Sequence, residues 1–147
     1  RTGGFFWLPS AWASDDVTAI AMAKNGIAVY PEVLFAFRSS GINITCRKSS
    51  PKDLRDKLNA YKIYEKWLKE LVASMAAVYE PNNPYYKYVK DNHKKKYIRG
   101  LLVEVIFGSS FKALMCNLKL FYSLDSVGFV WGTYWIVRFI LRELKLN

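Results

Sequence analysis

The sequence predicts an α+β protein that is mostly α, with a small irregular α/β N-terminal portion packed on a C-terminal helical bundle. Of its 147 residues, 52% are hydrophobic and 16% aromatic, which suffices for a packed core and excludes disorder of the whole chain. Glycine and proline break the first third into short segments, whereas apolar residues recur at helical spacing after it. The length allows one domain of ordinary size, which we divide into residues 1–50 and 51–147.

The first element that we expect is a short helix from about residue 15 to 25. Ser14, Asp15 and Asp16 offer capping oxygens and negative charge to the start of a helix. Apolar residues then recur at helical spacing, and Gly26 can end the helix in a left-handed conformation.

The next element is an extended segment. Residues 27–30 and 33–37 are apolar, aromatic and β-branched, and Pro31 separates the two runs. Such residues favour extended backbone, and the proline confines it to an edge position or a kink. A turn ending at Gly41 follows.

A long helix is expected from Pro51 to Glu80. Ser50 as N-cap, proline at the first helical position and Asp53 three residues after the cap form a capping-box-like start. Pro81 cannot continue the helix, since it lacks an amide donor. One continuous apolar stripe is formed by Leu54, Leu58, Tyr61, Tyr64, Leu68, Leu71, Met75 and Val78.

Residues 85–147 predict two or three further helices, with breaks near 108–110 and 125–126. The last segment, residues 127–141, is apolar nearly all round. As a helix it would rise about 22 Å, short of the roughly 30 Å hydrocarbon core of a bilayer, and it would carry Arg138. We therefore expect a buried helix or one that lies on a membrane surface.

The charge points to anionic partners. Twenty-two Lys and Arg against twelve Asp and Glu give a net charge of +10, which suits nucleic acid, anionic lipid head groups or a nucleotide substrate. The sequence lacks a recognisable nucleic-acid-binding motif, so nucleic acid is the least favoured partner. A basic run before aromatic helices suits an anionic membrane, with a solvated helix face as the alternative; its candidate anion contacts are Lys94, Lys95, Lys96 and Arg99.

Cysteine and histidine offer little catalytic or metal-binding chemistry. Cys46 and Cys116 have neither the number nor the spacing of a disulfide framework or a zinc site. We read them as reduced thiols of a cytoplasmic protein. His93, the one histidine, lies in the basic run and is expected to be solvated. We therefore expect no metal or cofactor to be bound by this chain.

Four stretches of the N-terminal third carry a resemblance when they are taken in order. They are Thr2-Gly3-Gly4-Phe5, Leu8-Pro9-Ser10-Ala11-Trp12, Ser14-Asp15-Asp16 and Arg38-Ser39-Ser40-Gly41-Ile42-Asn43-Ile44-Thr45. Together they resemble the C-terminal part of the catalytic domain of family-2 glycosyltransferases of the GT-A fold, especially bacterial enzymes of surface polysaccharide assembly. The resemblance covers about residues 1–70.

The resemblance implies a catalytic base. In that family an acidic pair begins a helix, and its second member removes a proton from the acceptor hydroxyl. In this chain that role would fall to Asp16. Simple helix capping is the alternative role of this acidic pair. For Arg38, the alternative to acceptor binding is a surface salt bridge. The resemblance places the acceptor-binding residues at Asp15, Trp12, Gly3, Gly4 and Arg38.

The same resemblance implies an inverting glycosyltransferase that moves a sugar from a nucleotide-sugar donor to a glycan or lipid-linked acceptor. The family's nucleotide-binding half and its Asp-x-Asp motif for Mg²⁺ or Mn²⁺ would precede the glycine loop and are not in this sequence. We therefore expect a fragment that is inactive alone, in the cytoplasm or peripheral on the inner face of the plasma membrane. The alternative is a noncatalytic helical module that binds an anionic membrane surface or a protein partner.

Overall fold

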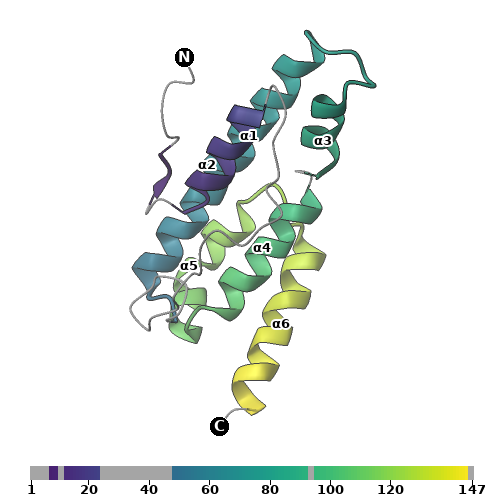
Figure 1. Cartoon of the computed structure of the whole chain (residues 1–147). Helices are drawn as coiled ribbons and strands as arrows, with labels where there is room; N and C mark the ends of the chain where they lie inside the picture. The colour runs from purple at the N-terminus through teal and green to yellow at the C-terminus, as the bar shows by residue number, and fades with distance from the viewer. Residues whose placement is uncertain (1–6, 10–11, 24–47, 93–94, 146–147) are drawn as a thin grey trace, which may run out of the picture.

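A computed structural model of the protein describes residues 7–9, 12–23, 48–92 and 95–145 (Figure 1). For Asp16 and residues 91–92, 95–97 and 145 it describes the backbone alone. Over these ranges the protein is mostly helical and has no sheet, which confirms the mostly-α class. The extended segment expected at residues 27–37 lies outside the described residues. The helices are α1 (Ser14–Met22), α2 (Pro51–Ala76), α3 (Pro84–Asn92), α4 (Lys95–Phe107), α5 (Phe111–Tyr122) and α6 (Phe129–Lys145).

Helix α2 is the central element, and its start confirms the prediction. The Ser50 hydroxyl accepts from the Asp53 N–H at 3.2 Å, and the Asp53 carboxylate accepts from the Ser50 N–H at 3.1 Å. This capping box satisfies two amide donors that a helix start would otherwise leave open. The helix contacts α3, α4 and α5.

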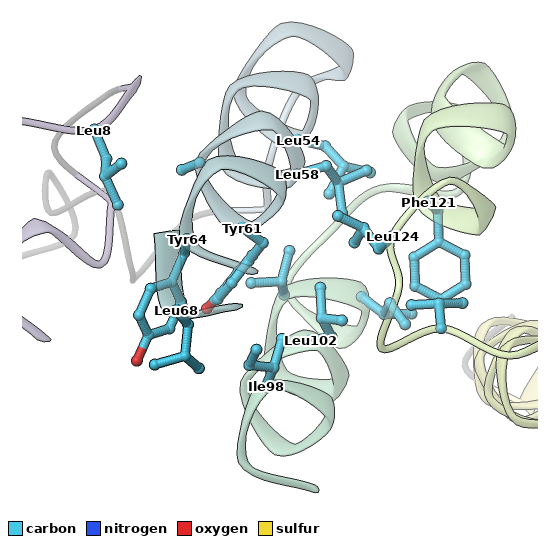
Figure 2. Close-up of a cluster of buried hydrophobic side chains, with 14 of the residues drawn as sticks. Leu8, Leu54, Leu58, Tyr61, Tyr64, Leu68, Ile98, Leu102, Phe121 and Leu124 are labelled. Carbon is cyan, nitrogen blue, oxygen red and sulfur yellow. The ribbon is translucent and has the colours of Figure 1, made fainter. Parts of the chain in front are cut away.

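The apolar stripe of α2 forms much of the core. Figure 2 shows its side chains together with core residues of α4 and of the α5–α6 region. Six of the eight predicted positions are buried, and Leu71 is half-buried. The predicted end near Glu80 is wrong: the helix stops at Ala76, because the chain turns there toward α3 and packs the Tyr79 ring against Tyr85. Val78 is therefore left 76% exposed in that turn.

Helix α1 differs from the prediction at both ends. Its N-cap is Ala13, in the left-handed region at φ 58°, and no side chain caps it. Ser14 does not serve as the cap because its hydroxyl accepts the Leu8 N–H at 2.9 Å. The helix ends at Met22, three residues before the expected end. The Tyr85 hydroxyl of α3 donates to the carbonyl of Ile20 at 2.8 Å and so ties α1 to the bundle, and burial raises the pKa of Tyr85.

The described residues between 84 and 145 form four helices, where the sequence predicted two or three: α3 ends at Asn92 and α4 begins at Lys95. Both predicted breaks are confirmed. The Ser110 hydroxyl caps α5 by accepting from the Ala113 N–H at 3.2 Å. Backbone bonds join Ser49 to Gly108 and Ser110, which fixes the start of α2 beside the α4–α5 turn.

Helix α6 lies along one side of the bundle and contacts α4 and α5 (Figure 1). Gly132 allows the close approach: a Cβ there would lie 2.7 Å from Cε1 of Tyr122 and 2.9 Å from Cγ1 of Val127. Phe139 is fully buried, with its ring centroid 6.1 Å from that of Phe107. The sequence left open a buried helix or one on a membrane surface; α6 is buried on one side only, since its other side does not meet the bundle.

Candidate functional site

A second row of apolar side chains on α6 faces away from the bundle. Its members follow one another at intervals of four and three residues, so they share one side of the helix. Their exposed fractions run from 48% at Val137 to 81% at Val130. The row rises about 21 Å along the helix. We call this row the outer stripe: Val130, Tyr134, Val137, Leu141 and Leu144.

Arginines on aromatic rings border the outer stripe. The Arg138 guanidinium lies 5.7 Å from the ring centroid of Tyr134 and donates to its hydroxyl at 3.0 Å. The Arg142 guanidinium lies 5.2 Å from the ring centroid of Phe107. The sequence of α6 holds a single acidic residue, Glu143, and both of its carboxylate oxygens accept from Lys48 at 3.1 Å. The exposed side of α6 is therefore both apolar and positively charged.

The N-terminal end of the outer stripe meets Arg99 of α4. The Arg99 Nε donates to the Ser126 carbonyl at 2.7 Å, and its guanidinium carbon lies 5.3 Å from the ring centroid of Trp131. These two contacts fix the side chain beside a concavity of about 520 Å³. We call it the Arg99 concavity; it is lined by Arg99, Gly128, Phe129, Val130, Trp131 and Tyr134.

Of the other predicted anion contacts, Lys95 and Lys96 lie in the first turn of α4, where the structure describes their backbone alone. Lys94 lies outside the described residues. Among the predicted contacts, the structure therefore places the side chain of Arg99, and it places that side chain next to the outer stripe.

The acidic pair occupies the first turn of α1. Asp15 is exposed, and for Asp16 the backbone alone is described. Trp12 packs against α2: its Nε1 donates to the Tyr61 hydroxyl at 3.0 Å, and the Lys57 ammonium lies 4.1 Å from its ring centroid. The other predicted acceptor-binding residues, Gly3, Gly4 and Arg38, lie outside the described residues.

Comparison with known proteins assigns no family to this chain. No family model, curated protein or solved structure matches this chain. Over the described ranges, none of the helices combines the length and apolar content that crossing a membrane requires. The same ranges bring no three His, Cys, Asp or Glu side chains together in a way that could hold a metal ion.

A larger apolar cavity of about 680 Å³ lies between α2, α3 and α4. The charged side chains Glu65, Lys69 and Asp125 at its edge are already engaged, whereas the buried Ser126 hydroxyl has no hydrogen-bond partner among the described residues. The Glu65 carboxylate accepts from the backbone N–H groups of Asp125 and Ser126. Lys69 donates a hydrogen bond to the Asp125 carboxylate, which raises the pKa of that amine. These contacts make the edge a structural joint between α2 and the α5–α6 turn.

The two sides of α6 were not predicted from the sequence. Residues 127–141 are apolar nearly all round, and the helix continues beyond them to Lys145. The signal that could have revealed the outer stripe is its spacing of four, three, four and three residues, which continues to Leu144. The buried row, Gly132, Ile136 and Phe139, lies on the opposite side of the helix.

Proposed function

We propose that this chain is a helical module that binds the surface of an anionic membrane through the outer stripe of α6. The observation that carries the proposal is the row of five exposed apolar side chains bordered by arginines. An amphipathic helix on a membrane buries its apolar side at the boundary of head groups and acyl chains. Tyrosine and tryptophan favour that boundary, because one part of the ring system is apolar and another forms hydrogen bonds.

The charge favours a membrane over a second copy of this chain. Arg138 and Arg142 border the outer stripe, and the one carboxylate of α6 already pairs with Lys48. Two such surfaces facing each other would bring like charges together, whereas an anionic membrane contributes about 1 kcal/mol for each basic residue near it. Nucleic acid would satisfy the arginines but would leave the apolar row of α6 in water.

The test compares two exposed valines. Val137→Asp is expected to weaken partition into vesicles that contain an anionic phospholipid by about tenfold or more, because an apolar anchor is lost and a negative charge is added. Val78→Asp is the matched control, since Val78 is more exposed and lies in the turn after α2. Valine and aspartate have similar helix propensities, so α6 should persist. Vesicle flotation measures the binding, and circular dichroism checks the fold.

Two results would contradict the proposal. Equal losses from Val137→Asp and Val78→Asp would show that only the total charge matters. The second result is a wild-type protein that does not float with vesicles but forms a dimer, which Val137→Asp dissociates. The outer stripe would then bind a second copy of the chain. Sedimentation of the same samples distinguishes these outcomes.

A second candidate function rests on α1. We propose that the chain is the acceptor side of an inverting glycosyltransferase, because the acidic pair Asp15 and Asp16 begins a helix, as the resemblance requires. The helix dipole and the free amides of a first turn favour ionised carboxylates, and an ionised carboxylate is a competent base. The Asp16 carboxylate would take the proton of an acceptor hydroxyl while that oxygen attacks the anomeric carbon and the nucleoside diphosphate leaves.

Transfer by a longer protein that contains this chain and a nucleotide-binding half tests the second candidate. Asp16→Asn is expected to lower kcat by about 100-fold or more, since a general base contributes at least that factor. Asp56→Asn in α2 is the control and should retain activity. Unchanged turnover of Asp16→Asn at equal expression would exclude Asp16 as the base.

A further inference from the structure

We infer that the Arg99 concavity binds the phosphate group of a phospholipid head group. The inference rests on the proposed function and deepens it, because it assigns a specific lipid contact to one end of the outer stripe. The concavity opens where α6 begins, and two of its lining residues, Val130 and Tyr134, belong to the stripe.

Arg99 is held in place, and among the described residues its two terminal nitrogens remain free to donate hydrogen bonds. Its Nε is used by the Ser126 carbonyl, and its guanidinium plane is supported by the ring of Trp131. The terminal nitrogens Nη1 and Nη2 form no hydrogen bond to a described residue. A guanidinium can donate two parallel hydrogen bonds to a phosphate, and an arginine already fixed by packing loses little freedom when it does so.

The lining of the concavity suits a lipid rather than a small soluble anion. Five of its six residues are glycine or apolar and aromatic, and none is acidic. Phe129 and Val130 are 77% and 81% exposed at its rim, where they would meet acyl chains. Gly128 lies next to the guanidinium: a Cβ there would be 3.8 Å from Nη2 of Arg99, an ordinary van der Waals contact. Charge and apolar surface are thus arranged as a phospholipid presents them, with phosphate next to hydrocarbon.

The test uses two arginines of the same charge. In vesicles of phosphatidylcholine with phosphatidic acid, Arg99→Gln is expected to weaken binding about tenfold more than Arg142→Gln, because it removes specific hydrogen bonds as well as charge. Arg99→Lys keeps the charge but not the fork, and it should restore little of the loss. Circular dichroism and thermal unfolding check that the variants fold.

A second measurement identifies the source of the phosphate. Soluble short-chain phosphatidic acid is expected to shift the indole N–H resonance of Trp131 in the wild-type protein, assigned with Trp131→Phe, and Arg99→Gln should abolish the shift. Inorganic phosphate is expected to leave the resonance in place. A shift with inorganic phosphate alone would reassign the concavity to a free anion and overturn the lipid contact.

The failures of the two proposals are distinguishable. Wild-type protein that floats with vesicles, loses binding in Val137→Asp and responds equally to Arg99→Gln and Arg142→Gln would overturn the phosphate site alone. Full rescue by Arg99→Lys would do the same. Wild-type protein that binds none of these vesicles would overturn membrane binding and the phosphate site together.

Discussion

Replacing Glu65 with alanine is expected to lower the free energy of unfolding by about 3–5 kcal/mol. The Glu65 side chain is buried in α2, and its two carboxylate oxygens accept from the N–H groups of Asp125 and Ser126 at 2.9 and 2.8 Å. Without the carboxylate, two backbone donors of the α5–α6 turn, one buried and one partly buried, lose their partner. Each buried donor left unsatisfied costs about 1–3 kcal/mol.

Two further variants test whether the lost hydrogen bonds cause this loss of stability. In Glu65→Gln only one oxygen remains and the amide nitrogen would face an N–H group, so a loss of about 2 kcal/mol is expected. Glu70→Ala is the control, because Glu70 is an exposed residue of the same helix with one long contact to Lys66 at 3.9 Å. Its effect should stay within about 0.5 kcal/mol. Urea unfolding measures all three, and equal losses in Glu65→Ala and Glu70→Ala would contradict the structural role.

Glu65 also connects the core to the candidate site. It binds the Ser126 N–H, and the carbonyl of Ser126 accepts from Arg99. One turn thus holds both the carboxylate of α2 and the guanidinium beside the Arg99 concavity. The position of Arg99 depends on this turn, and the turn depends on a carboxylate 61 residues earlier in the chain.

Where the cause is local, the sequence was sufficient. The start of α2 follows from Ser50, Pro51 and Asp53, which lie next to one another and satisfy the helix amides by themselves. The break before α5 likewise follows from Gly108 and a capping serine at position 110. The predicted core stripe of α2 is recovered because one side of a long helix must be apolar wherever it packs.

Where tertiary contacts decide, the sequence was not sufficient. Ser14 resembles an N-cap in the sequence, but its hydroxyl accepts a hydrogen bond from the Leu8 N–H instead. Glu65 looks like one more polar position of α2, and nothing near it in the sequence marks its partners in the α5–α6 turn. The two sides of α6 are both apolar, so composition cannot say which one the bundle covers; Gly132, which admits Tyr122 and Val127, decides it.

Two phenylalanines of α6 separate stability from membrane binding. Phe139→Ala is expected to lower the free energy of unfolding by about 3–5 kcal/mol, because it removes a fully buried ring that packs against Phe107 and leaves a cavity between α4 and α6. Phe129→Ala should change stability by no more than about 0.5 kcal/mol, since Phe129 is exposed at the start of the helix.

Vesicle binding should reverse the order of the two variants. Under conditions where both remain folded, Phe129→Ala is expected to weaken flotation severalfold, because its ring would enter the head-group region, whereas Phe139→Ala should bind as the wild type does. The reversal requires that one side of α6 holds the fold and the other meets the membrane. Parallel losses of stability and binding in both variants would mean that the start of α6, where Phe129 lines the Arg99 concavity, has no membrane-binding function separate from the fold.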